Sequence, residues 1–198
     1  GLIGRSEDEF DVGMALAEQD HSVLHGLAQV VQLHHGLGDA RESGDVHPSD
    51  PQKGLFDPVE GVKVDQMIGD VETLTIGNQT LTAIATPGHS PGGTSWRWTS
   101  CENGKCLDIV YADSISAVSA DEYRFSDHPE YVAPLRATIS RVAAIKPCDI
   151  LITPHPSASA LFERLVGEMP LVRPNGCAEY AVGAKTRIEN RLAKESAK

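Results

Sequence analysis

The chain has 198 residues, of which 40% are hydrophobic and 23% are charged, a composition typical of one globular domain. Its formal net charge of -11, with no block of lysine or arginine, argues against nucleic acid as a partner because phosphates would be repelled. No apolar run approaches the roughly 20 residues of a membrane-spanning helix, and the first residues do not resemble an export signal, so we expect no membrane contact and no signal peptide.

The N-terminal part is predicted to hold one helix and a loop. Apolar residues recur loosely at helical spacing from Val12 to Leu33, which indicates an amphipathic helix. Residues 36–58 are rich in Gly, Asp and Pro, and the prolines at 48 and 51 cannot continue a helix, so this segment is predicted to be a loop.

From Val62 onward, β-branched and polar residues alternate, a pattern typical of strands. Two tight turns are predicted, at Gly77-Asn78 and at Asn103-Gly104, because these residue pairs adopt positive φ readily. The expected strands are 62–64, 72–76, 79–84, 93–99 and 106–111.

Helices dominate the C-terminal part. A helix over 129–145 is predicted, with Ser126 or Asp127 near its cap and one apolar face formed by Val132, Leu135, Ile139 and Val142. A short strand at 149–153 and helices at 157–166 and 177–193 follow. Strands first, then helices mixed with one strand, predict a layered α/β domain.

Four cysteines predict two disulfides, for which three connectivities exist. We favour Cys101 with Cys106, across the predicted hairpin turn, and Cys148 with Cys177. The alternative is free buried thiols in a cytosolic protein. Because disulfides persist mainly in oxidising compartments, the pairing favours a periplasmic or secreted location.

Two histidines lie immediately beyond predicted strand ends. His89 follows one strand in a loop rich in proline and glycine, and His155 stands between two prolines after another. Such loops fix the direction of an imidazole and let the backbone approach a small ion, so both are candidate metal ligands. A single loop histidine is more often solvated, and the case therefore depends on the surrounding motifs.

Four motifs together resemble, in order and spacing, the metallo-β-lactamases of the third subclass. They are Thr86-Pro87-Gly88-His89-Ser90-Pro91-Gly92-Gly93-Thr94-Ser95-Trp96, Val110-Tyr111-Ala112-Asp113-Ser114, Tyr123-Arg124-Phe125-Ser126-Asp127 and Thr153-Pro154-His155-Pro156-Ser157. The resemblance spans residues 42–198, leaving 1–41 as an atypical N-terminal segment.

The resemblance implies an αββα sandwich with two zinc ions and a small-molecule β-lactam substrate. It implies that His89 is a ligand of the first zinc and His155 of the second. Ser114 and Ser116 match positions that hold water or the substrate carboxylate, and the two cysteine pairs match bridges of relatives. A zinc pair lowers the pKa of bound water toward about 7, so such enzymes need no serine nucleophile. Ser114 is accordingly interpreted as a positioning residue, because no Gly-x-Ser-x-Gly elbow surrounds it.

The chain departs from the family at its N-terminal end. The His-x-His-x-Asp-His motif, which supplies four of the six zinc ligands, is missing, and Asp20, His21 and His25 offer only a weaker helical alternative. We therefore expect an incomplete N-terminal half with an uncovered apolar sheet face, fewer than two zinc ions and impaired or absent hydrolysis. The alternatives are a non-catalytic remnant of the fold and a metal-free, disulfide-stapled binding module; the oligomeric state is not predicted.

Overall fold

The computed structural model describes residues 32–33, 48, 50–55, 60–61 and 66–197. The boundary at 41, the strand expected at 62–64 and most of the helix expected over 12–33 lie outside these residues. The last two residues of that helix are instead strand β1 (Gln32–Leu33), which pairs in parallel with β2 (Met67–Ile68). The helix prediction is wrong there because pairing with a distant strand overrides a loose local periodicity.

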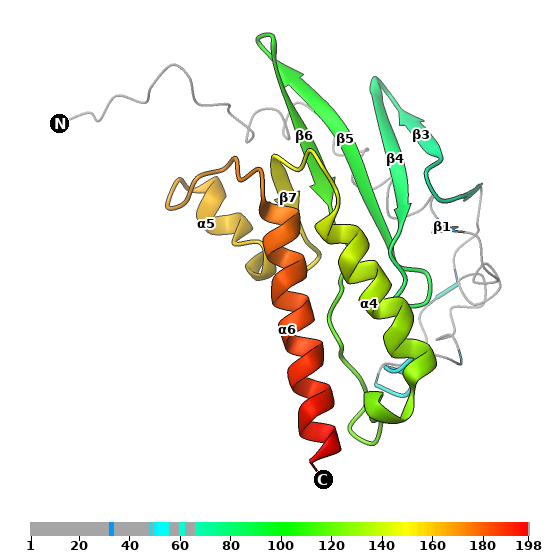
Figure 1. Cartoon of the computed structure of the whole chain (residues 1–198). Coiled ribbons are helices and arrows are strands. Elements are labelled where there is room, and N and C mark those ends of the chain that lie inside the picture. The colour runs from blue at the N-terminus through cyan, green and yellow to red at the C-terminus, as the bar shows by residue number, and fades with distance from the viewer. Residues whose placement is uncertain (1–31, 34–47, 49, 56–59, 62–65, 198) are drawn as a thin grey trace.

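A five-stranded sheet forms the centre of the described fold. Its order is β3-β4-β5-β6-β7, and every neighbouring pair is antiparallel except β6 and β7, which run in parallel. Figure 1 shows the long β5–β6 hairpin extending beyond the rest of the sheet. The strands are β3 (Thr73–Ile76), β4 (Gln79–Ala85), β5 (Thr94–Glu102), β6 (Lys105–Tyr111) and β7 (Ile150–Ile152), each within a few residues of its prediction.

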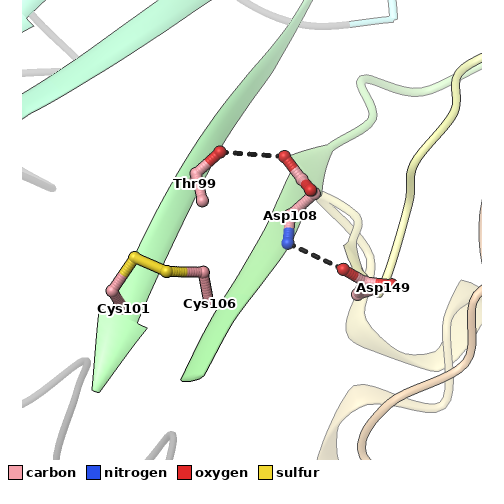
Figure 2. The surroundings of a disulfide bond; sticks show 5 residues. All are labelled: Thr99, Cys101, Cys106, Asp108 and Asp149. Carbon is pink, nitrogen blue, oxygen red and sulfur yellow. Dashed lines mark hydrogen bonds between the residues drawn. A yellow bond between two sulfur atoms is a disulfide. The ribbon is translucent and has the colours of Figure 1, made fainter. Parts of the chain in front are cut away.

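Both predicted tight turns are present. Gly77 has φ 61°, and Asn103 and Gly104 have φ 50° and 79°, values that glycine and asparagine tolerate better than other residues. Cys101 and Cys106 face each other across the second turn and are joined by a disulfide (Figure 2). This bridge is the one expected from the hairpin pattern.

A short polar network lies beyond that bridge. The Thr99 hydroxyl donates to a carboxylate oxygen of Asp108 at 2.9 Å, and the backbone N–H of Asp108 donates to the carboxylate of Asp149, also at 2.9 Å (Figure 2). These contacts connect β5, β6 and the residue that precedes β7. The segment that enters the last strand is therefore held to the hairpin by side chains as well as by the sheet.

Two helices, α4 (Pro129–Ala143) and α6 (Gly176–Ser196), pack side by side against one face of the sheet (Figure 1). The predicted apolar face of α4 is buried there, with the sheet residues Ile84, Val110 and Leu151 beneath it. The second disulfide, Cys148–Cys177, lies in the same core and links the approach to β7 with the first turn of α6. An α/β fold is thus confirmed.

The start of α4 differs from the prediction. Its N-cap is His128, without a side-chain cap, and Ser126 and Asp127 belong to the preceding 3-10 turn η1 (Phe125–Asp127). These two residues are engaged elsewhere: the N–H of Ser126 donates to the carboxylate of Glu195, and Asp127 pairs with Arg124. Competition from these tertiary contacts explains why neither caps the helix.

The helix expected over 157–166 is broken in two. A 3-10 turn η2 (Pro156–Ala158) is followed by α5 (Leu161–Leu165), and Ala160 between them has φ 51°, outside the helical region. The buried Ser159 hydroxyl accepts a hydrogen bond from Thr153 and donates to the carbonyl of Pro156, which stabilises a turn in place of a continuous helix.

The opposite face of the sheet is also apolar. Leu81, Ala83 and Trp96 form a cluster there with Ile68 of β2, and each of the four is less than 10% exposed. The expectation of an uncovered face is therefore wrong for this patch, since β2 packs on it. No helix in the described part of the chain is both long and apolar enough to cross a bilayer.

Candidate metal site at one edge of the sheet

Strand direction brings the predicted site residues to one edge of the sheet. β4 and β6 are both antiparallel to β5, and β7 is parallel to β6, so β4, β6 and β7 run in the same direction. Their carboxyl ends meet at one edge. His89 lies in the loop after β4, Ser114 and Ser116 in the segment after β6, and His155 in the loop after β7.

The loop that carries His89 is closed by a short backbone contact. The N–H of Thr86 donates to the carbonyl of Gly93 at 2.8 Å, and a Cβ atom on Gly93 would lie 2.3 Å from the Thr86 carbonyl oxygen. A Cβ on Gly88 would lie 2.7 Å from Leu135 of α4. Both positions need glycine for close packing, and the result is a loop whose shape is set by its backbone.

The His89 ring is oriented by the segment after β6. Its Nδ1 lies 3.0 Å from the carbonyl oxygen of Ser116 and 3.2 Å from the hydroxyl of the same residue, which in turn lies 2.8 Å from the Ser114 hydroxyl. Because a carbonyl oxygen only accepts, Nδ1 carries the proton in the neutral ring, and the lone pair is on Nε2. Nε2 itself lies 3.4 Å from the amide nitrogen of Gln52.

Two side chains also hold the backbone of His89. The Tyr131 hydroxyl donates to its carbonyl oxygen at 3.3 Å, and the Gln52 amide does so at 3.5 Å. Burial, followed by the charge of Asp50, raises the pKa of Tyr131 far above its usual value, so this phenol remains protonated and stays a donor. His89 is thus fixed at both its ring and its backbone.

Asp113 supports the two serines, although the sequence was not interpreted in this way. One carboxylate oxygen accepts from the N–H of Ser114 at 2.7 Å, and the other accepts from the N–H of Thr94 at 3.1 Å. Its own N–H donates to the hydroxyl of Ser95 at 3.0 Å. An acidic residue two positions after the end of β6 is the sequence signal that would have identified it.

Among the described residues, His155 is held through its backbone and not through its side chain. Its carbonyl oxygen accepts from the N–H of Ala158 at 2.9 Å and lies 2.8 Å from the Thr153 hydroxyl, whose one proton it shares with Ser159, while its side chain is exposed. Within the described ranges, the His155 imidazole makes no hydrogen bond to His89, Ser114 or Ser116. The structure therefore joins His89 to the two serines and leaves His155 separate on the same edge.

Comparison with solved structures shows what this arrangement is similar to. The metallo-β-lactamase MIM-1 from Novosphingobium pentaromativorans is 44% identical and has a TM-score of 0.80, over 85% of this chain and 62% of MIM-1. The metallo-β-lactamase SMB-1 is 40% identical with a TM-score of 0.78, over 84% of this chain and 66% of SMB-1. MEM-A1, a subclass B3 metallo-β-lactamase from a soil metagenome library, is 36% identical with a TM-score of 0.78, over 85% of this chain and 66% of MEM-A1.

The chain belongs to the subclass B3 metallo-β-lactamases. It spans slightly less than two thirds of the length of these relatives. No protein-family model matches it.

The donor set of this metallo-β-lactamase chain can be compared with what a zinc pair needs. Catalytic zinc sites in proteins use about three protein ligands per ion. In the part of the chain that the structure covers, no group of three or more His, Cys, Asp or Glu side chains could hold a metal ion. Asp20, His21 and His25 lie outside the described residues. The described residues thus contain no complete set of ligands for a dinuclear zinc centre.

Proposed function

We propose that this chain carries part of the machinery for zinc-dependent β-lactam ring opening and, as it stands, binds fewer than two zinc ions tightly and hydrolyses β-lactams poorly or not at all. The observation that carries the proposal is the hydrogen bond from His89 Nδ1 to Ser116, which leaves Nε2 as the ligand atom. In this proposal His89 and His155 are the metal ligands and the substrate is a small β-lactam, as the names of the relatives suggest.

The two serines have a supporting role in this proposal. Ser114 is buried and hydrogen-bonded to Ser116, whose hydroxyl and carbonyl both reach the His89 ring. A serine in that position orients the imidazole and can also hold water or a substrate carboxylate. Because Nδ1 of His89 carries the proton that it donates to the Ser116 carbonyl, Nδ1 cannot act as a general base for these hydroxyls, and the serines are positioning residues rather than nucleophiles.

The low zinc affinity follows from ligand number. One imidazole on each of two separate loops gives each ion a single fixed protein ligand among the described residues, and a site of that kind loses most of the chelate advantage of a preorganised centre. Zinc bound in this way exchanges readily with solvent.

A second candidate function is a metal-free binding module of the same fold. The two disulfides favour it, because they brace the β5–β6 hairpin and the junction of β7 with α6 without any metal. This reading predicts no specific zinc binding at all, whereas the first predicts weak binding that depends on His89.

Zinc titration by calorimetry, paired with a hydrolysis assay, separates these readings. We expect fewer than two tightly bound ions and little turnover of a carbapenem, and we expect His89→Ala to remove the share of the residual zinc binding that depends on its imidazole. His128→Ala is the matched control, since His128 is a partly exposed histidine at the start of α4 and is no proposed ligand. Two tight ions together with rapid hydrolysis would overturn the proposal.

We also propose a periplasmic or secreted location, supported by the two disulfides. Thiol counting under denaturing conditions, on protein produced in the periplasm, tests the two disulfides on which this proposal rests. The expected result is no free thiol, and four free thiols would contradict it.

A further inference from the structure

Three arginines line one cavity beside helix α6, on the side where α5 and η2 lie. The cavity has a volume of about 190 Å³, and its walls include Arg164 of α5, Arg187 of α6 and Arg173, which precedes α6. Neither His89 nor the serine pair Ser114 and Ser116 lines it. It is therefore built from residues outside the candidate metal site.

Arg164 is the unusual member of this set, because it is only 2% exposed. Its Nη2 donates to the carbonyl oxygen of Leu151 at 2.7 Å, but its Nε is buried and has no hydrogen-bond partner among the residues that the structure describes. Burial, followed by the positive charge of Arg173, lowers the pKa of Arg164. A buried guanidinium with an unmatched donor and no carboxylate partner is costly, so the site is short of negative charge.

The remaining charges around the cavity do not correct that shortage. Among the described residues, Glu179 is the only acidic residue of the lining, and it forms an ion pair with Arg173. Three arginines against one glutamate leave two positive charges in a chain whose formal net charge is -11. Arg187 forms no ion pair with any residue in the described ranges. Positive charge is thus concentrated at this cavity, although the chain as a whole is negatively charged.

We propose that this arginine cavity binds a tetrahedral oxoanion of the phosphate type. Guanidinium groups present planar arrays of N–H donors that match the oxygen atoms of phosphate, and an anion would supply the negative partner that Arg164 and Arg187 lack. The volume is sufficient for an ion of that size together with water. The site needs no zinc and stands apart from the proposed hydrolase function.

The test uses inorganic phosphate with the full chain in zinc-free buffer. Phosphate binding is measured by calorimetry and by the rise in Tm, each against sodium chloride at equal ionic strength. We expect saturable binding, weakened by about tenfold or more in Arg187→Gln and in Arg173→Gln, because each removes a charge-assisted contact. Both side chains are at least partly exposed, so neither change should prevent folding.

Two further variants make the test specific. Lys185→Gln removes the same charge from an exposed position on the same helix outside the cavity, and it should leave phosphate affinity unchanged within about twofold. Glu179→Gln removes the competing carboxylate and should tighten binding. The proposal is overturned if chloride reproduces the phosphate effect, if Arg187→Gln binds as well as Lys185→Gln, or if Glu179→Gln weakens binding.

Discussion

The Nδ1 atom of His89 donates a hydrogen bond to the backbone carbonyl of Ser116 at 3.0 Å, joining two loops that leave neighbouring parts of one sheet edge. The acceptor is a backbone atom, so the contact does not depend on the Ser116 side chain. This arrangement holds the neutral ring in the form protonated on Nδ1, whereas the Nε2-protonated form would lose the hydrogen bond.

The tautomer of His89 is the first prediction. Nitrogen NMR of the neutral ring should show the proton on Nδ1 and a bare Nε2. Ser116→Ala should leave this result unchanged, because it removes only the hydroxyl contact at 3.2 Å and keeps the carbonyl. Observing the proton on Nε2 in the unaltered protein would contradict the proposed orientation of the ligand atom.

Substituting Gly93 with alanine should destabilise the protein. The added Cβ would meet the Thr86 carbonyl oxygen at 2.3 Å, so the backbone of the loop must move. We expect a loss of about 3 kcal/mol in the free energy of unfolding, measured with urea. Gly183→Ala in the middle of α6 is the control, because its Cβ would meet only the flexible end of Arg187 and the change favours the helix by up to about 1 kcal/mol. Equal effects at the two positions would argue against a tight loop.

Glu195 fastens the C-terminal end of α6 to the turn before α4. Its carboxylate accepts from the N–H of Ser126 at 2.8 Å and pairs with Arg191. Burial acts to raise the pKa of Glu195, but these hydrogen bonds and the Arg191 charge outweigh it and hold the pKa below its usual value. At about pH 7, Glu195→Gln should therefore cost about 2 kcal/mol of stability.

The same contact predicts a pH dependence. The pKa of Glu195 is lower in the folded protein than in the unfolded chain, where it is about 4.3. The stabilisation by its carboxylate is therefore complete above the unfolded-state pKa and disappears as the pH falls through the folded-state pKa. The free energies of unfolding of the unaltered protein and of Glu195→Gln, both measured with urea, should therefore converge as the solution is acidified. Glu189→Gln on the same helix, which breaks an exposed pair with Arg136, should cost at most about 1 kcal/mol at neutral pH. A constant difference between the Glu195 variant and the original at all pH values would show that charge is not involved.

The two disulfides should contribute unequally. Cys148–Cys177 closes a sequence separation of 29 residues and is buried, whereas Cys101–Cys106 closes 5 residues at an exposed hairpin. Loop-closure entropy gives about 4 kcal/mol for the first and about 2 kcal/mol for the second. Paired alanine substitutions, compared by urea unfolding, should show that order, and the reverse order would be inconsistent with it.

Much of the fold could be predicted from local patterns. The hairpin at Gly77-Asn78, the apolar face of α4 and the extent of α6 depend on residues close together in sequence, and each was predicted from spacing and turn chemistry. The break at Ala160 could not be predicted in this way, because it depends on a hydrogen bond between Ser159 and Thr153 that forms only in the folded chain.

In the candidate site, too, some features depend on local sequence and others on contacts that form only in the folded chain. His89, His155, Ser114 and Ser116 were proposed from the family resemblance, and all of them except Ser116 lie within one of its four motifs. The contact that orients His89 depends on strand order, which brings the loops after β4 and β6 together. The role of Asp113 was missed for the same reason: its carboxylate bridges the N–H groups of Ser114 and Thr94, which are distant in sequence from one another.

Strand β7 is an edge strand of the sheet, and two backbone carbonyls in and next to it already accept hydrogen bonds on the side that faces away from β6. The guanidinium of Arg164 donates a hydrogen bond to the carbonyl of Leu151, and the backbone N–H of Arg173 donates to the carbonyl of Asp149, each at 2.7 Å. A strand from another molecule would have to displace these donors before it could extend the sheet there. The Arg164 side chain, one of the three that make the cavity electropositive, therefore also protects this edge of the sheet from intermolecular β-pairing.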